Sequence, residues 1–494
     1  MASMTLLRDP TEKEQQPLQD HEAAPDQVER ATVSHHKRWG RFLLKKPTFT
    51  QQFSHIYNRR LQMLKMPLLE AAKARWKGVE ICDRLVSVIE GEERVLIGTL
   101  FKRMEIRPSV LEEYKAERGI SEKISVPEGN FSHDKDSLLL EDDSGRVALV
   151  GAALDIHTMV AGVVLAVKGV VLPDGTFQVT DWCPPGIAPQ AEVGPEDEEK
   201  CPPEAQVLLV SGLLVGATHD DLPTKMLIDY VAGYLGGEGT ESACNIAQVI
   251  VCGDSVAPMA EVISAPGAKG KATREAASKE VVAQRKEFDA ALAQIAASCP
   301  VDVMPGSTDP SDYMLPQQPM HKLLLPVASA FSTTRRTTNP YEAIIGGRTF
   351  LGNSGQPLHN MQQYTRYGEE DGAKGTGEPW QLEVLAKTLE WRHQAPTAPG
   401  TLGCHPFAKE DPFVITECPH VYFAGNQDEY ATKEVNGVDG QQVRVICVPS
   451  FAKTGQGVLV NIKTLQSMPI SFLAELDPEE PRPQAGGTAD DLTA

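Results

Sequence analysis

The sequence lacks an apolar run that could cross a bilayer. A membrane-spanning helix needs about 20 consecutive apolar residues, whereas the most apolar stretch, 147–172, is interrupted by Asp155, His157 and Lys168. The first residues, MASMTLLRDPTEKEQQP, also lack the charged and then apolar order of a signal peptide. We therefore expect no contact with a membrane and a location inside the cell.

Disulfide frameworks and metal-binding cysteine pairs are missing as well. The nine cysteines are scattered and odd in number, and no C-x-x-C pair occurs among them. This distribution is typical of a reducing compartment and argues against a zinc ribbon or a secreted disulfide framework. Aromatic residues make up only 6% of the chain, so the side chains on which single-stranded DNA would stack are few.

Positive charge is also scarce, because 47 Lys and Arg stand against 67 Asp and Glu, a net charge of −20. A negative field repels phosphate and argues against a protein that coats nucleic acid on its own, although a local basic groove stays open. What the chain does have is an ordinary globular composition, with 41% hydrophobic residues. Its 494 residues are enough for two or three domains.

Three polar segments divide the chain. Residues 1–46 are polar and mixed in charge, and we predict that they form a disordered arm. The basic residues at the end of this arm fit either a nuclear import signal or a solvated surface. The proline and glutamate content of residues 193–204 predicts an interdomain linker, and residues 475–494 are predicted to be an acidic disordered tail. Two folded regions remain, 47–192 and 205–474.

The first folded region should combine one helix with a small β-barrel. Phe53, Tyr57, Leu61 and Leu64 are spaced so that they share one face of a helix. About five strands with Gly-marked turns follow, which is the pattern of an OB-fold barrel. A fragment of a β-sandwich is the alternative, because periodicity does not separate the two. The strand-like segments are 94–102, 138–151 and 163–181.

The second folded region alternates strands and helices. Its apolar runs are continuous, as in a sheet that is buried on both faces, and helical patterns lie between them. This alternation predicts a layered α/β/β domain. The predicted strands are 207–216, 247–254, 301–306, 421–426 and 443–449.

Small polar signatures follow four of the apolar strands. Ligands of open α/β sheets bind where the carboxyl ends of the strands meet, so we expect these four points to converge. Their order and spacing resemble the calcineurin-like metallophosphoesterases, whose signatures hold two metal ions that activate a water against phosphate. The four signatures are Ser211-Gly212-Leu213, Gly253-Asp254, Gly306-Ser307-Thr308-Asp309 and Gly425-Asn426-Gln427-Asp428.

The resemblance breaks down at the metal ligands. Ser211 and Leu213 stand where that family has an aspartate and a histidine, and Thr308 replaces the histidine that protonates the leaving group. Asp254 and Asp309 keep their carboxylates, but two ions need more donors than this. We therefore expect no metal, no cofactor and no catalytic residue. The positions that we interpret as vestigial are Ser211, Leu213, Asp254, Ser307, Thr308, Asp309, Asn426 and Asp428.

A barrel followed by a disabled phosphoesterase resembles the accessory B-subunits of replicative B-family DNA polymerases. Local motifs are similar to one family among them, the small, second subunits of DNA polymerase delta, over roughly residues 50–470. The motifs lie in both folded regions and in order. They are HIYNRRLQML (55–64), GTLFKRM (98–104), VDVMPGSTDP (301–310), LPQQPMH (315–321), TNPY (338–341), FLGNSGQ (350–356), APTAPGTLGCHPF (395–407) and DPFVITECPHVYFAGN (411–426).

This resemblance implies a non-catalytic scaffold in the nucleus. In that family the subunit binds the cysteine-rich C-terminal domain of the catalytic subunit and a third, regulatory subunit, and thereby tethers the assembly to the sliding clamp. The resemblance also implies that polymerase zeta uses the same pair of subunits. It implies that DNA is contacted weakly or only within the complex.

Three alternatives stay open from the residues alone. The first is a metal-dependent phosphodiesterase or nuclease that uses Asp254 and Asp309 with ligands that the motifs do not show. The second is an OB-fold protein that binds single-stranded DNA by itself, and the third is an adaptor unrelated to replication.

Overall fold

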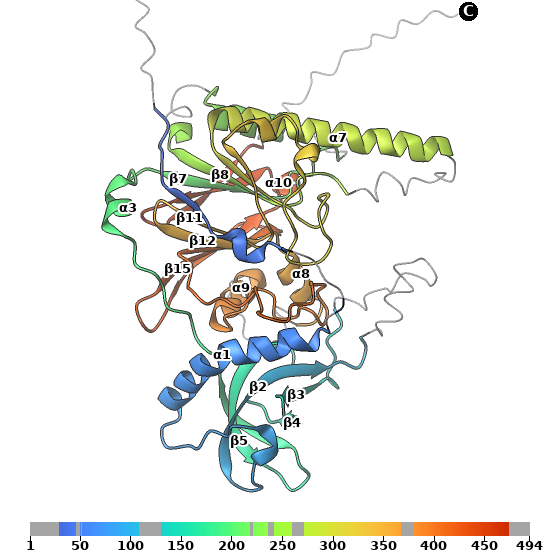
Figure 1. Cartoon of the computed structure of the whole chain (residues 1–494), viewed down its shortest axis with the longest axis vertical. Coiled ribbons are helices and arrows are strands. Elements are labelled where there is room, and N and C mark those ends of the chain that lie inside the picture. Colours follow the sequence, from blue (N-terminus) through green and yellow to red (C-terminus); the bar gives the residue numbers. More distant parts are fainter. Residues whose placement is uncertain are drawn as a thin grey trace, which may run out of the picture.

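The computed structural model describes residues 29–45, 50, 52–107, 130–217, 221–235, 242–258, 271–366 and 379–473. These residues form a small β-barrel, a helix that lies against it, and a larger domain of two sheets with helices (Figure 1). The barrel lies at the bottom of Figure 1 and the larger domain above it. Within these ranges, no helix has both the length and the apolar character that a membrane span requires.

A closed five-stranded barrel forms the first domain. Its strands are β2 (Glu93–Arg103), β3 (Ser137–Glu141), β4 (Arg146–Val150), β5 (Val164–Val171) and β6 (Phe177–Cys183). They pair in the order β2-β3-β4-β6-β5. Asp142 builds the β3–β4 turn, because its carboxylate accepts hydrogen bonds from the backbone N–H groups of Ser144 (2.7 Å) and Gly145 (2.9 Å). The predicted OB-fold barrel is confirmed, and its closure excludes the sandwich alternative.

Helix α1 (Ser54–Arg75) packs against β2 and β5 of the barrel. The face that it buries differs from the predicted one. Leu64 belongs to both faces, but Phe53 precedes the helix and is 45% exposed. The reason is that a charged residue, Arg60, occupies the buried face, so a search for apolar residues alone missed it. The buried side chains of the helix are Ile56, Arg60, Leu64, Leu68 and Ala72.

Two six-stranded sheets pack together in the second domain. Sheet 1 has the order β1 (His35–Lys37), β11 (Tyr341–Ile345), β12 (Arg348–Asn353), β13 (Val421–Gln427), β15 (Gln442–Pro449) and β14 (Ala431–Asn436). Sheet 2 has the order β10 (Thr334–Arg336), β9 (Val301–Met304), β8 (Ile246–Cys252), β7 (Gln206–Val210), β16 (Gln456–Asn461) and β17 (Ser467–Ser471). Along β7, Val207 and Leu209 pack with sheet 1, whereas Leu208 and Val210 pack with helices on the other face.

Helices cover the outer face of each sheet. α4 (Leu222–Ala232) and α7 (Lys271–Ser298) pack on sheet 2, and α8 (Gln356–Gln362) and α9 (Trp380–Glu390) lie on the side of sheet 1 that faces the barrel (Figure 1). The predicted α/β/β layering therefore gains a second helical layer. The remaining short helices are η1 (Trp39–Phe42), η2 (Leu85–Ser87), η3 (Lys322–Leu324), η4 (Ala328–Ala330) and α10 (Phe451–Thr454).

The prediction of a disordered arm over residues 1–46 is wrong for residues 29–45. β1 adds an antiparallel strand to the edge of sheet 1 beside β11. Trp39 and Phe42 are buried, and Arg30 donates a hydrogen bond to the carbonyl oxygen of Val231 (2.6 Å). Strand pairing uses backbone groups, and two large aromatic side chains anchor the segment, so a polar composition did not prevent it from folding. Residues 1–28 and 46 lie outside the described residues.

The segment 193–204, which was predicted to be a linker, contains a short helix that has no buried residue but forms polar contacts with the sheet domain. α3 (Pro195–Lys200) begins with proline at its first position and carries acidic residues in its first turn, both of which favour a helix start. Asp197 accepts a hydrogen bond from Ser34 (2.8 Å), and Glu198 forms an ion pair with Arg348 (3.0 Å). The same proline and glutamate residues therefore build a helix here instead of an open linker. The predicted tail, 475–494, lies outside the described residues.

Arg60 of α1 joins the two domains. Its side chain is completely buried, and its Nε donates to Asp411 (2.8 Å). Its Nη1 donates to the carbonyl oxygens of Gly162 in the barrel domain (2.9 Å) and Pro396 in the sheet domain (2.7 Å), and its Nη2 donates to that of Ala398 (2.6 Å). A buried guanidinium needs such partners, because an unpaired buried charge is costly.

Asp411 completes this cluster by accepting a second hydrogen bond, from His393 Nε2 (2.9 Å). Burial, together with the charge of Arg60, lowers the pKa of His393 to about 4, so the ring is neutral at pH 7. Burial opposes the ionisation of Asp411, but His393 and Arg60 together hold the pKa of that carboxyl well below its usual range. Asp411 therefore remains charged and balances Arg60.

Replacing Asp411 with asparagine should destabilise the protein strongly. The asparagine side chain has the same shape as the aspartate but no charge, so the buried charge of Arg60 is left unbalanced. We expect Asp411→Asn to lower the free energy of unfolding by about 3–5 kcal/mol, measured by denaturant titration. The control is Glu434→Gln, which removes an exposed partner of Arg444 (3.1 Å) and should cost about 0–1 kcal/mol. Equal, small losses in both variants would contradict this account.

Candidate functional site

The four predicted strand ends meet in the second domain. The backbone N–H of Gly212 donates to the carbonyl oxygen of Gly253 (2.9 Å). Asn426 donates its backbone N–H to Ser211 Oγ (2.9 Å), and Ser307 Oγ donates to Asp254 Oδ1 (3.0 Å). The ends of β7, β8, β9 and β13 are thus connected directly to one another, as strand order alone predicted.

Glycine permits this close approach. Gly253 has a φ of +87°, and Gly425 lies so near β8 that a Cβ there would be 2.7 Å from the carbonyl oxygen of Cys252. A Cβ on Gly306 would overlap with the backbone and side chain of Asp254. These glycines therefore set how tightly the strand ends pack.

Asp254, the one retained bridging position, is bound by the protein itself. Its residue has a φ of +54°, which is unusual for a side chain other than glycine. Both carboxylate oxygens lie within hydrogen-bond distance of Ser307 Oγ (3.0 and 3.1 Å), and Oδ1 also accepts the backbone N–H of Thr308 (3.0 Å). Both oxygens of this carboxylate therefore have donors from the protein itself.

Asp309 links two of the loops. Its Oδ1 accepts the backbone N–H groups of Ser255 (2.8 Å) and Val256 (3.1 Å), and its Oδ2 accepts that of Gly306 (2.8 Å). Burial and, second, the neighbouring Asp254 carboxylate raise the pKa of Asp309 to about 7, although the three N–H groups oppose this. Its contacts are those of a buried structural carboxyl.

Ser211 and Leu213 also have structural surroundings. Ser211 Oγ is completely buried, lies within hydrogen-bond distance of the carbonyl oxygens of Val448 (3.2 Å) and Pro449 (2.9 Å), and accepts the N–H of Asn426. Leu213 is 4% exposed and packs in the apolar layer beneath α4. A leucine in an apolar layer has no ligand to offer a metal.

Two residues of the fourth signature, Asn426 and Asp428, lie in different surroundings. Asn426 has a φ of +58°, and its Nδ2 donates to the carbonyl oxygen of Ser354 (2.9 Å), so it belongs to the converging strand ends. The side chain of Asp428 is 67% exposed and forms an ion pair with Lys453 (3.5 Å). Of the eight predicted positions, Leu213 and Asp428 therefore differ from the others, because their side chains do not take part in the hydrogen bonds that connect the strand ends.

Sequence reasoning missed a fifth strand end, that of β12. Ser354 follows this strand and accepts a hydrogen bond from Asn339 Nδ2 (2.9 Å), which also donates to Gln317 Oε1 (2.8 Å) and Gln356 Oε1 (2.8 Å). The signal was present, because FLGNSGQ is also an apolar strand followed by small polar residues. The rule that predicted the other four ends would have predicted this one.

The residues present do not fit the two metal ions of the phosphoesterases that the signatures resemble. Within the described ranges, no group of three or more His, Cys, Asp and Glu side chains is placed to hold an ion. Beside the strand ends lies a cleft of about 440 Å³ whose walls include Ser307, Gln317, Gln356 and Asn360. These four side chains offer neutral hydrogen-bonding groups, but the same walls also include Asp309, whose pKa is raised to about 7, together with Asp312 and His359.

Comparison with known proteins extends over both domains. The family model for the OB-fold domain of DNA polymerase delta subunits matches residues 52–182, and the model for the B subunits of DNA polymerases alpha and epsilon matches residues 207–433. The DNA polymerase delta small subunit of Oryza sativa subsp. japonica is 39% identical over 86% of this chain and 94% of its own length. DNA polymerase delta subunit 2 of Drosophila melanogaster is 35% identical over 88% of this chain and 96% of its own length. The DNA polymerase delta small subunit of Saccharomyces cerevisiae is 31% identical over 86% of this chain and 90% of its own length.

The coupling between the two carboxyls predicts a pH effect on stability. The folded pKa of Asp309, about 7, lies above its unfolded value of 3.8, so its contribution to stability is present at low pH and is lost as the pH rises through 7. Asp254→Asn removes the second cause of the raised pKa. We expect this variant to lose less stability than the unmodified protein between pH 5.5 and 8, by about 1.4 kcal/mol for each unit that the pKa falls.

Thermal unfolding at the two pH values measures this difference. Asp428→Asn, a change at an exposed carboxylate, is the matched control and should follow the unmodified protein. Identical pH dependence in the Asp254→Asn variant and the unmodified protein would show that the two carboxyls are not coupled.

Proposed function

The chain belongs to the family of DNA polymerase delta small subunits, and we propose that it is a non-catalytic accessory subunit that links the catalytic subunit to a further regulatory subunit in replication and repair synthesis. The observation that carries this proposal is the continuous similarity across barrel and sheet domains, which covers 86% of the chain in the rice relative. The converging strand ends support it, because they are held together by the protein's own hydrogen bonds.

We infer the partners from membership of this family. We propose that the chain binds the cysteine-rich C-terminal domain of the polymerase catalytic subunit and a third subunit, and contacts the sliding clamp only through them. We also propose that it acts in the nucleus, that polymerase zeta uses the same pair of subunits, and that DNA is bound weakly or only within the complex. The net charge of −20 is consistent with a surface that binds proteins rather than free DNA.

The join between the domains suits a linking role. Because one buried guanidinium binds backbone groups of both domains, the barrel and the sheet domain are fixed relative to each other. Partners that bind to different domains are then held at a set distance. A flexible connection between the two domains would not hold bound partners at a set distance.

Co-purification tests this function. The tagged full-length chain, added to nuclear extract, should retain a large B-family polymerase chain, and a tagged unrelated acidic protein should not. Absence of any polymerase chain would overturn the proposal. So would manganese-dependent hydrolysis of DNA or of an aryl phosphodiester by the purified protein, if Asp254→Ala abolished that activity.

Two substitutions at the predicted vestigial positions should distinguish effects on stability from effects on binding of the catalytic subunit. Ser211→Ala removes a buried hydroxyl with three partners and should lower the free energy of unfolding by about 1–3 kcal/mol. Thr308→Ala removes a hydroxyl that no described residue hydrogen-bonds, and it should leave stability nearly unchanged. Both folded variants should still bind the catalytic subunit in a pull-down. Loss of binding by folded Thr308→Ala would show that partner binding depends on the converging strand ends.

A further inference from the structure

A groove lies between α4 and α7, the two helices that cover the outer face of sheet 2. The helices contact each other and pack on the sheet through buried side chains, among them Leu227 of α4 and Phe288 of α7. In the middle of the groove α7 presents the small side chains of Ala290 and Ala291, which leave a pocket of about 330 Å³ between the helices. The groove shares no residue with the cleft beside the converging strand ends.

The floor of this groove is apolar. Val215 and Ile228 line the pocket although they are only 4% and 7% exposed, so they form its deepest part. Ala290 is exposed and Ala291 half-buried, and both extend the apolar surface along α7. An apolar group that covers this floor releases the water there, which is favourable.

The rim of the groove is acidic. Asp221 and Asp229 of α4 and Glu287 of α7 line it together with one cation, Lys225, and three negative charges against one positive give a net charge of −2. None of these four side chains forms an ion pair or a hydrogen bond with another described side chain. The carboxylates are therefore available to an incoming cation.

Other charges of α7 do not cancel this acidic rim. Glu280 lies about two turns before Glu287 on the same face and adds a carboxylate at one end. At about 100° per residue, Lys279 and Lys286 are turned about 80–100° from Glu287, and Arg285 about 160°. These three cations are not among the residues that line the groove.

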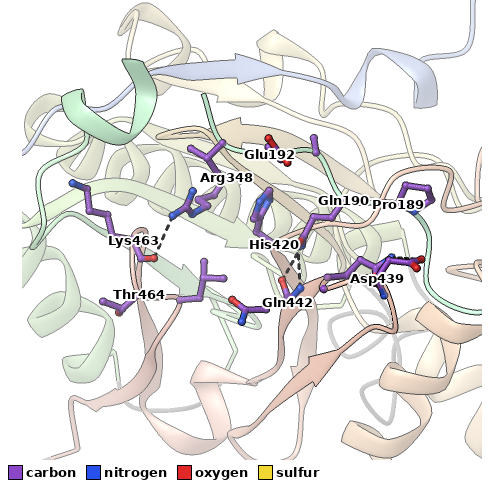
Figure 2. A pocket seen from close by; sticks show the side chains of 14 residues that line it. Pro189, Gln190, Glu192, Arg348, His420, Asp439, Gln442, Lys463 and Thr464 are labelled. Carbon is purple, nitrogen blue, oxygen red and sulfur yellow. Dashed lines mark hydrogen bonds between the residues drawn. The ribbon is translucent and has the colours of Figure 1, made fainter. Parts of the chain in front are cut away.

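The pocket at the amino ends of β12, β13 and β15 is larger but differs in this respect (Figure 2). Its charges have both signs, and its polar groups bond to one another. Arg348 forms an ion pair with Glu198 (3.0 Å), and Gln190 Nε2 donates to the carbonyl oxygen of Gln442 (2.8 Å). A ligand would compete with these bonds, whereas the carboxylates of the groove between α4 and α7 have no described partner to lose.

We propose that the groove between α4 and α7 binds a basic segment of a partner protein. An apolar side chain of that segment covers Val215 and Ile228, and its lysine or arginine side chains meet Asp221, Asp229 and Glu287. Nucleic acid has the wrong charge for this surface. A small polycation such as spermidine would meet the carboxylates but has no branched apolar group for the floor.

The position of the groove leaves the barrel accessible. α7 lies at the end of the molecule opposite to the barrel (Figure 1), so a protein bound beside it does not cover the barrel surface. This inference goes beyond the proposed function and does not depend on it, because the test below uses the purified chain without any polymerase subunit.

A substitution in the groove tests the site. The probe is a fluorescein-labelled peptide, Lys-Arg-Leu-Leu-Arg-Lys, whose binding to the full-length protein is followed by fluorescence anisotropy. Ala290→Arg fills the groove and adds a positive charge, so the Kd should rise by about tenfold or more. Ala297→Arg, the same change at an exposed alanine of α7 outside the groove, is the matched control and should leave the Kd unchanged.

A second pair of variants tests the charge of the rim. Asp229→Asn combined with Glu287→Gln should raise the Kd by about fivefold or more. Asp143→Asn combined with Glu429→Gln removes two exposed carboxylates outside the groove and should have no effect beyond that of the total charge. This control separates the groove from general attraction to an acidic protein.

Peptide and polyamine competitors test the kind of ligand. The peptide in which serine replaces both leucines should bind more weakly, and spermidine should displace the labelled peptide only at a much higher concentration than the unlabelled peptide does. Equal Kd values for Ala290→Arg and Ala297→Arg, or for the two charge variants, would overturn the site. Equal affinity of the serine peptide would overturn the apolar contact, and equal displacement by spermidine would overturn the protein partner.

Discussion

The structure depends on the burial of one charged group between the two domains. Arg60 has lost all contact with water, so every N–H of its guanidinium must find an acceptor in the protein. Gly162 of the barrel is essential to this arrangement, since its φ is +89° and a Cβ there would overlap with the carbonyl oxygen of Pro396 and with Arg60. The barrel and the sheet domain can meet this closely only with glycine at the contact and Asp411 beneath it.

The same principle accounts for the converging strand ends. A metallophosphoesterase stabilises several carboxylates in a small volume with metal ions, and without the ions the repulsion must be met in another way. Here Ser307 and the N–H of Thr308 bind Asp254, and three backbone N–H groups bind Asp309. Ser211, Leu213 and Asn426 are neutral, and Asp428 forms an ion pair with Lys453. Donors of the protein itself therefore bind both retained carboxylates.

Local rules predicted the parts of the fold that local chemistry determines. Strand-like segments with Gly-marked turns predicted the barrel, and small polar residues after apolar strands predicted the converging loops. The rest depends on contacts that no window of sequence contains. In β1, His35 reaches Asp302 (2.9 Å), 267 positions away along the chain, and the buried Arg60 is balanced by Asp411, which lies opposite it. Charged residues whose partners are distant in sequence look like surface residues until the fold brings the partners together.

At the carboxyl edge of sheet 1, hydrogen bonds within the protein hold the strand ends together, so a ligand there would have to displace some of them. These bonds do not satisfy every polar atom of that edge. Thr308 Oγ1, Ser255 Oγ and Asn353 Nδ2 are buried and have no hydrogen-bond partner among the described residues. The convergence of the strands therefore depends on a subset of the polar groups there, and the packing of the glycines brings the others close without pairing them.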